Sequence, residues 1–316
     1  MFLVTGGAGF IGSNIVEALV ASGRAVRVLD NLANGRRENL ATFGSRVDWM
    51  DGDIRDLDAC RRAVAGVEVV LHLAALGSVP RSIADPETSN DVNVVGTLNV
   101  LIAARDAKVR RLVYSSSSSV YGDNPTLPKQ EDLATSPISP YAVTKLAAEH
   151  YTRVFSRVYG LETVSLRYFN VFGPRQRADS PYAAVIPLFM QAARDRAPVP
   201  INGDGLQSRD FTYVTNVVSA NLLAASAPGV SGRAFNVACG ERYSLLDIVE
   251  ALSAAIGRPL EREHHVARLG DVRHSQADVS AAMRDLGYRV EVGFRDGLAR
   301  TWRAFDAAQS SGHGAG

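Results

Sequence analysis

The chain has 316 residues, of which 46% are apolar, and its formal net charge is +1. This apolar share excludes an intrinsically disordered chain, and the length suits about two domains. The balanced charge indicates neither nucleic acid nor an anionic membrane as a partner. Two cysteines, no basic leader and no long apolar run predict a cytoplasmic protein without disulfides. Three histidines between residues 264 and 274 lack a carboxylate–histidine ligand pattern, so no metal site is expected.

Residues 1–170 are predicted to alternate between short apolar strands and amphipathic helices. The strands lack polar alternation, which is typical of a parallel sheet covered on both faces. This order of elements predicts a Rossmann-type, doubly wound α/β fold. The expected strands cover Phe2–Thr5, Ala25–Asp30, Val47–Met50, Val67–His72, Arg111–Ser115 and Thr163–Phe169, and the expected helices cover Gly12–Ser22, Leu57–Val64, Thr88–Ala107 and Tyr141–Tyr159.

The pattern differs in residues 171–316, where prolines and glycines are frequent and regular alternation stops. We expect a smaller α/β domain here that binds the substrate and ends in a loose tail. Its expected helices include Leu245–Ile256 and Phe294–Ala307. Arg233–Ala238 is expected to be a strand that returns to the first sheet. The boundary is therefore expected to be interleaved, with about 211–240 joining the first domain.

The first expected strand leads into GGAGFIG and then a helix, which is the context of a dinucleotide-binding turn. Glycines there let the backbone turn sharply and let a pyrophosphate approach the helix N-terminus. Asp30 follows where a carboxylate can accept hydrogen bonds from the adenosine ribose. This carboxylate favours NAD, whereas Arg36 and Arg37 keep NADP as an alternative. Asp53 is either a contact to adenine or a residue of the turn after the third strand.

Tyr141 and Lys145 lie four residues apart in an expected helix, which places both on one face. A tyrosine that acts as a base near pH 7 needs its pKa lowered by about three units, which corresponds to roughly 4 kcal/mol. A neighbouring ammonium and a positive nicotinamide ring can supply this by stabilising the phenolate. Ser117 follows a buried strand at the sheet edge where ligands bind, and its hydroxyl can hold the reacting oxygen. Together the three residues predict proton handling during oxidation by hydride transfer.

Further motifs follow in order along almost the whole chain: LDN, GDI, HLAA, NVVGT, SSSSSVYGD, SPYAVTK, LRYFNVFGP, INGDG, SRDF and GDVRHS. With them the chain resembles the extended short-chain dehydrogenase/reductase superfamily, in its nucleotide-sugar epimerase and dehydratase branch. The resemblance implies a tightly bound, recycled NAD and a UDP-sugar substrate. It also implies a homodimer formed through the two long helices of the first domain.

The resemblance also implies roles for individual residues. Ser117, Tyr141 and Lys145 would be catalytic. The cofactor would be bound by Gly6, Gly9, Phe10, Ile11, Gly12, Asp30, Asn31, Asp53, Ile54, Leu73, Ala74, Ala75, Asn93, Tyr141, Lys145 and Tyr168. The substrate would be bound by Gly77, Ser78, Ser117, Ser118, Ser119, Asn170, Arg177, Val185, Asn202, Arg209, Arg268, Asp271 and Ser275.

The residues after Ser117 bear on the reaction. A 4,6-dehydratase of this branch needs an acid and a base there, usually Asp-Glu, whereas this chain has Ser118 and Ser119. The glutamate of the UDP-glucuronate decarboxylases that resemble this branch is also absent. Epimerisation at C4 needs only the Ser/Tyr/Lys set and NAD, so we expect a UDP-sugar 4-epimerase. The alternatives are a dehydratase, a decarboxylase or a reductase of this superfamily, and a non-catalytic NAD-binding sensor.

The sugar remains open at this point. Ser275 is small where epimerases restricted to plain hexoses have a bulky residue, which leaves room for an N-acetyl group. Gly77 and Ser78 also match the UDP-N-acetylhexosamine 4-epimerases. Arg177 instead matches UDP-glucuronate 4-epimerases, because an arginine can clamp a carboxylate with two hydrogen bonds. It could equally be a surface arginine, and plain glucose or galactose remains a further alternative.

Overall fold

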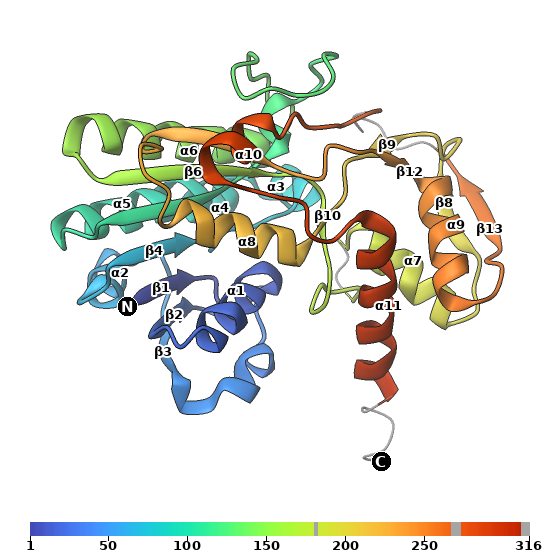
Figure 1. The fold of residues 1–316 in the computed structure, drawn as a ribbon, viewed down its shortest axis with the longest axis horizontal. Helices are drawn as coiled ribbons and strands as arrows, with labels where there is room; N and C mark the ends of the chain where they lie inside the picture. Colours follow the sequence, from blue (N-terminus) through green and yellow to red (C-terminus); the bar gives the residue numbers. More distant parts are fainter. Residues whose placement is uncertain (180–182, 267–272, 311–316) are drawn as a thin grey trace.

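The computed structural model describes residues 1–179, 183–266 and 273–310. Its larger part is a seven-stranded sheet in the order β11-β6-β5-β4-β1-β2-β3 (Figure 1), and every neighbouring pair is parallel. The expected Rossmann-type fold is confirmed. The strands are β1 (Phe2–Thr5), β2 (Val26–Asp30), β3 (Val47–Asp51), β4 (Val69–His72), β5 (Arg111–Ser117), β6 (Glu162–Tyr168) and β11 (Arg233–Val237).

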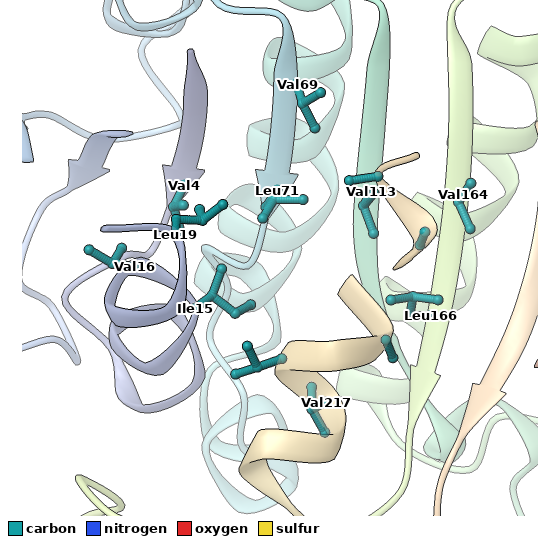
Figure 2. Packing of buried hydrophobic residues seen from close by; sticks show 14 of the residues in the cluster. Val4, Ile15, Val16, Leu19, Val69, Leu71, Val113, Val164, Leu166 and Val217 are labelled. Carbon is teal, nitrogen blue, oxygen red and sulfur yellow. The ribbon is translucent and has the colours of Figure 1, made fainter. Parts of the chain in front are cut away.

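Helices cover both faces of this sheet, as its apolar strands predicted. On one face α1 (Phe10–Ala21) and α8 (Val214–Ala224) pack against Val4 and its neighbours, and Figure 2 shows Val217 of α8 in this cluster. On the other face α2 (Leu57–Val64), α5 (Gly96–Asp106) and α6 (Pro140–Tyr159) pack with Leu3. Adjacent strand residues thus face opposite layers, because side chains alternate along a strand.

Two expected elements differ in the structure. The helix expected at Thr88–Ala107 consists of α4 (Pro86–Asn90), a π-helical turn (Asp91–Val95) and α5. The wider turn lies where the buried side chain of Asn93 hydrogen-bonds to the main chain of Leu76. Strand β5 continues through Ser117 instead of ending before it, because Ser116 and Ser117 still pair with β6.

A second cluster of buried residues lies beside the sheet, on the right in Figure 1. It is built by α7 (Val185–Arg194), α9 (Leu245–Ile256) and α11 (Phe294–Ser310) together with β8 (Val199–Asn202). The exposed strand β13 (Arg262–His265) pairs in parallel with β8. The remaining elements are a 3₁₀ segment (Arg37–Arg46), a 3₁₀ turn (Ser118–Tyr121), α3 (Val79–Ala84), α10 (Ser280–Leu286) and the short strands β7 (Val171–Phe172), β9 (Ser208–Arg209), β10 (Thr212–Tyr213) and β12 (Tyr243–Ser244).

The chain returns to the first sheet after forming part of this second cluster. Strand β11 pairs with β6, and α8 packs on α1. Helix α10 also packs on this sheet layer, through Ala282 and Leu286, although it lies outside the expected interval 211–240. The division into two domains remains a prediction. Among the residues described, no helix is both long and apolar enough to cross a membrane.

Candidate functional site

A cavity of about 1340 Å³ lies at the carboxyl ends of the sheet strands. Its walls include the glycine turn after β1, the loop after β4, the end of β5 and residues of the second cluster such as Arg209. A pocket for one drug-sized ligand measures roughly 300–1000 Å³. The cavity therefore has space for two ligands side by side, at the sheet edge where parallel α/β folds bind them.

The glycine turn brings backbone to the cavity where no side chain would fit. Gly6 has φ +70°, and a Cβ there would lie 2.8 Å from the amide nitrogen of Ala74. A Cβ on Gly12 would lie 2.2 Å from the carbonyl oxygen of Gly6. Helix α1 begins after Gly9, which has no side chain to cap it. Its first N–H groups are therefore suited to bind an anion such as a pyrophosphate.

Asp30 ends β2 beside this turn and is buried. Its Oδ2 accepts a hydrogen bond from the amide of Ala8 (2.9 Å), and its Oδ1 accepts one from the amide of Leu32 (2.8 Å). Burial raises the pKa of its carboxyl, and these two hydrogen bonds oppose that shift. Because each carboxylate oxygen can accept more than one hydrogen bond, the fixed group can still receive two ribose hydroxyls.

The two arginines that kept NADP as an alternative have other partners. Arg36 forms an ion pair with Asp179, and the Arg37 guanidinium lies 5.0 Å from the centre of the Trp49 ring. Asp53 lines the cavity, where its carboxylate binds Arg55 (2.7 Å) and accepts a hydrogen bond from Asn31 (2.9 Å). The hydrogen bonds from Arg55 lower its pKa. A contact from Asp53 to adenine remains a prediction.

Ser117, Tyr141 and Lys145 come together at one wall of the cavity. Ser117 ends β5, and Tyr141 follows Pro140 at the start of α6, where Ser139 caps the helix by accepting from the amide of Ala142 (3.2 Å). The Ser117 hydroxyl accepts a hydrogen bond from the Ser119 amide (3.1 Å), and its interaction with the Tyr141 hydroxyl acts to lower the pKa of Tyr141. The Lys145 ammonium donates to the carbonyl oxygen of Ser115 (2.8 Å).

Burial dominates the titration of this pair. It raises the pKa of Tyr141, and the interaction with Ser117 opposes the shift. It lowers the pKa of Lys145 to about 7. The sequence predicted that Lys145 would lower the pKa of Tyr141. Among the protein's own groups burial has the larger effect, because the Lys145 ammonium is directed to the Ser115 carbonyl. The positive nicotinamide ring is the other contribution that this prediction named.

A buried histidine supports the loop that follows β4. His72 contacts the Thr5 hydroxyl through Nδ1 (2.7 Å) and the Thr97 hydroxyl through Nε2 (3.0 Å). The Thr5 hydroxyl also accepts hydrogen bonds from the amides of Leu73 and Ala74 (3.2 Å each). Burial lowers the pKa of His72 to about 3, so its ring is neutral at physiological pH. This residue of HLAA thus fixes the cavity wall from behind.

Asn93 also lies behind the wall and does not line the cavity. Its Oδ1 accepts from the amide of Leu76 (2.8 Å), and its Nδ2 donates to the Thr144 hydroxyl (3.0 Å). The Thr144 hydroxyl donates in turn to the carbonyl oxygen of Tyr141 (2.8 Å). Asn93 therefore connects the loop after β4 to the first turn of α6. Its predicted contribution to cofactor binding remains a prediction.

Most of the other expected residues line the same cavity. For the cofactor these are Gly6, Gly9, Phe10, Ile11, Gly12, Asp30, Asn31, Asp53, Ile54, Leu73, Ala74, Ala75 and Tyr168. For the substrate these are Gly77, Ser78, Ser118, Ser119, Asn170, Arg177, Arg209 and Ser275. Val185, which begins α7, and Asn202, which ends β8, are not among the residues that line it. Arg268 and Asp271 lie outside the described residues.

Arg177 already has a carboxylate partner within the chain. Its Nε donates to Oδ1 of Asp179 (2.9 Å), and its Nη2 donates to Oδ2 (3.2 Å). The hydrogen bond to Arg177 lowers the pKa of Asp179. Asp179 also pairs with Arg36, beside the cofactor end of the cavity. The arginine expected to clamp a sugar carboxylate is therefore partly neutralised by its neighbour in the sequence.

Several residues that line the cavity were not predicted, including Arg175, Gln176, Arg81 and Lys129. Three buried side-chain atoms on these walls have no hydrogen-bond partner in the part of the chain that the structure describes: Ser119 Oγ, Arg175 Nη1 and Gln176 Oε1. Such atoms are costly to leave unpaired, which indicates a polar ligand. The run of polar residues in GPRQR, after an apolar strand, was the signal available in the sequence.

Comparisons with known proteins agree on one family. The model of the NAD dependent epimerase/dehydratase family matches residues 2–238. A UDP-glucose 4-epimerase from Mycolicibacterium smegmatis is 41% identical, with 96% of this chain and 97% of that protein covered. A solved UDP-N-acetylglucosamine 4-epimerase from Methanobrevibacter ruminantium M1 is 39% identical with a TM-score of 0.93, covering 97% and 98% of the chains. A UDP-glucuronic acid 4-epimerase from Bacillus cereus, solved with UDP-glucuronic acid and NAD, is 31% identical with a TM-score of 0.90, covering 97% and 99%.

Proposed function

Because the chain belongs to the NAD dependent epimerase/dehydratase family, we propose that it inverts C4 of a UDP-hexose through a transient 4-keto sugar. One observation carries this proposal. Ser117 and Tyr141 line the same cavity as the glycine turn and Asp30. An oxidisable hydroxyl and a dinucleotide can therefore meet in one space.

NAD is the cofactor, and the residues around the cavity fit it. The close approach of Gly12 to Gly6 leaves backbone N–H groups for a pyrophosphate, and Asp30 offers a fixed carboxylate to the adenosine ribose. That carboxylate would repel the extra phosphate of NADP. When bound, NAD supplies the chemistry of accepting a hydride from C4 and returning it to the other face of the sugar.

The protein's own groups handle the proton. Ser117 holds the O4 hydroxyl while Tyr141 removes its proton, so that the electron pair of the O–H bond forms the C4 carbonyl as hydride leaves. Lys145, one turn along α6, donates to the Ser115 carbonyl beside this pair, and the positive nicotinamide ring would favour the charged form of Tyr141 when NAD is bound. After the sugar has turned in the cavity, Tyr141 returns the proton to O4. Ser118 and Ser119 offer no carboxyl group, so elimination of water, as in a dehydratase, is not supported.

For the sugar, we propose an uncharged C6 group and tolerance of an N-acetyl group at C2. Ser275 lines the cavity with a small side chain. The double hydrogen bond from Arg177 to Asp179 reduces its attraction for a second carboxylate. Because both side chains of this pair are substantially exposed, its strength is only about 0.2–1 kcal/mol, and UDP-glucuronate remains the alternative substrate.

We also propose a cytoplasmic homodimer. An apolar stripe runs along the outer face of α6, where Val143, Tyr151, Val154 and Val158 are exposed, and Val95 is exposed on the π-helical turn. Large apolar groups in such a row are typical of helix pairs between subunits. Light scattering should give twice the chain mass for the wild type and the chain mass for Val154→Asp/Val158→Asp. A monomeric wild type would contradict the proposal.

NMR of product mixtures tests the function directly. The purified protein, with no added NAD, is incubated separately with UDP-glucose, UDP-N-acetylglucosamine and UDP-glucuronate. We expect the C4 epimer of at least one sugar to accumulate to equilibrium, with UDP-N-acetylglucosamine converted faster than UDP-glucuronate. If the protein contains NAD but changes no sugar at C4, the epimerase proposal is wrong.

A further inference from the structure

We propose that Ser116 is a positioning residue for proton transfer, because it ties the strand end that carries Ser117 to a buried ion pair between Glu149 and Arg167. The proposal rests on the function above and concerns a residue that handles no proton itself. It explains how two separate elements, β5 and α6, keep Ser117 and Tyr141 together at the wall of the cavity.

The ion pair lies in the interior between α6 and β6. Arg167 Nη2 is 2.6 Å from Glu149 Oε1, and Arg167 Nε is 3.1 Å from Glu149 Oε2. The two side chains are only 4% and 5% exposed. A planar guanidinium held by both carboxylate oxygens has little freedom to rotate, so the pair fixes the orientation of the helix relative to the strand.

This ion pair binds the chain on both sides of Ser117. The buried Ser116 hydroxyl donates to Glu149 Oε2 (2.6 Å). Arg167 Nη1 donates to the Tyr121 hydroxyl (2.8 Å), at the end of the turn that follows Ser117. Ser117 is therefore carried on a short segment whose two ends bind the same pair of charges.

The same contacts set the register of α6. Glu149 lies one helical turn after Lys145 and two turns after Tyr141, so all three are on one side of the helix. A second contact agrees with this register, because the Lys145 ammonium donates to the Ser115 carbonyl. Loss of the Ser116 hydrogen bond would loosen β5 against α6 at the turn that carries the proton-transfer groups. Small displacements at reacting groups reduce rates strongly.

Ser165 provides a matched control on the neighbouring strand. Its buried hydroxyl bonds to Thr152 of α6 (2.9 Å), one turn farther from the cavity than Glu149. Ser165→Ala and Ser116→Ala each remove one buried serine hydroxyl that faces the same helix, and both leave the Glu149–Arg167 pair in place. Only Ser116→Ala frees the strand end beside Ser117.

The experiment compares wild type, Ser116→Ala, Ser116→Thr and Ser165→Ala as full-length protein with its own NAD. We measure Tm, NAD content, kcat, KM and the pH profile of kcat on the UDP-sugar that wild type converts. For Ser116→Ala we expect kcat to fall about tenfold, with KM changed less than about twofold and NAD retained. The pH profile of kcat should shift to higher pH. A less firmly held Ser117 would oppose the burial-induced rise in the pKa of Tyr141 less effectively. Ser116→Thr, which keeps the hydroxyl, should recover most of kcat.

Each result has a defined meaning. If Ser116→Ala and Ser165→Ala lose the same stability and the same small share of kcat, Ser116 has only a structural role and the proposal is wrong. A raised KM with unchanged kcat would instead indicate a substrate contact and would also overturn it. An inactive wild type that contains NAD would refute the proposed function rather than the role of Ser116. If Ser116→Ala does not fold, Ser116→Cys replaces it, because a thiol is a weak hydrogen-bond donor. Unchanged Tm and KM with reduced kcat then supports positioning, and full activity with an unshifted pH profile contradicts it.

Discussion

The two ends of the cavity treat their polar groups differently. Behind the glycine turn and the catalytic wall, His72, Asn93 and the Glu149–Arg167 pair are buried, and each has hydrogen-bond partners within the protein. On the loop after β7, Arg175 Nη1 and Gln176 Oε1 are buried without a partner among the described residues, and the Arg177–Asp179 pair is exposed. The groups behind the catalytic wall are fixed before any ligand arrives. The loop after β7 has bonding capacity left for a ligand, as does Ser119 Oγ beside Ser117.

This difference suits the two tasks of the site. Groups that stabilise a reaction are most effective when they are already oriented, because no reorganisation is then needed during the reaction. Groups that recognise a sugar can remain unpaired, at a cost of about 1–3 kcal/mol each, if the substrate later supplies the missing bonds. We therefore expect substitutions at the fixed end to change rates or folding stability. Substitutions at the open end should change which sugar is accepted.

The largest expected effect is at Tyr141. Tyr141→Phe removes the proton acceptor and should lower kcat by about 10²- to 10⁴-fold, since general base catalysis contributes this much. NMR of the C4 epimers measures the rate, and absorbance after denaturation measures the retained NAD. The control is Tyr243→Phe, which removes another hydroxyl, one that hydrogen-bonds to Glu241. Full activity of Tyr141→Phe would exclude this residue from proton transfer.

His72 should make the stability of the folded protein depend on pH in a characteristic way. Burial lowers its pKa from 6.5 to about 3, so between these values the unfolded chain binds more protons than the folded one. Stability therefore falls as pH falls below 6.5, by about 2 kcal/mol between pH 6.5 and 5. In urea unfolding, His72→Gln should be less stable at pH 7.5 and should lose this part of the pH dependence. The exposed His150→Gln should keep it, and identical pH slopes for wild type and His72→Gln would contradict the assignment.

At the open end, Arg177→Ala should separate the sugars. If a carboxylate at C6 reaches this arginine, kcat/KM for UDP-glucuronate should fall about tenfold relative to UDP-N-acetylglucosamine, as loss of a charge-assisted hydrogen bond predicts. Arg36→Ala is the matched control, because it removes the other arginine bound to Asp179 and leaves Arg177 in place. Equal losses of kcat/KM on both sugars would show that Arg177 does not contact the C6 substituent of the sugar.

Asp179→Asn should have the smallest effect, and it should raise kcat/KM for UDP-glucuronate where Arg177→Ala lowers it. It frees Arg177 from its partner and should raise kcat/KM for UDP-glucuronate by no more than about fivefold, because an exposed ion pair is weak. Conversion of UDP-N-acetylglucosamine should stay the same, as measured in parallel reactions. A fall in glucuronate turnover would mean that Asp179 assists the bound sugar instead of competing with it.

The fold could be predicted from the sequence because each buried strand is marked by a local run of apolar residues. Each predicted strand of the sheet lies within two residues of its observed bounds, since a strand buried on both faces must be apolar along its length. The two errors have a common cause. Ser116 continues β5 although it is polar, and Asn93 lies in a π-helical turn, because each is satisfied by a distant partner. Such pairings are not visible in a local pattern.

The residues of the site also fall into two groups: those that local spacing predicts, and those whose position depends on contacts formed only in the folded protein. The glycine turn, Asp30 and the Ser117–Tyr141–Lys145 set follow from spacing, and the comparisons confirm the family resemblance that the motifs indicated. Val185 and Asn202 were expected at the substrate, yet their position depends on how the second cluster packs against the sheet. The pairing of Arg177 with Asp179 was also missed. It joins residues two apart, but only the loop conformation brings them into contact.

The late return of β11 to the sheet has a consequence for synthesis on the ribosome. Until residues 233–237 have left the exit tunnel, β6 is an edge strand with unpaired N–H and C=O groups and no α8 or α10 over its apolar side chains. A nascent chain that stops near residue 170 would therefore expose an unpaired edge strand, which can pair with a strand of another copy. Genetic truncations intended to isolate the cofactor-binding part should retain residues through α10, even though most of the intervening chain packs elsewhere.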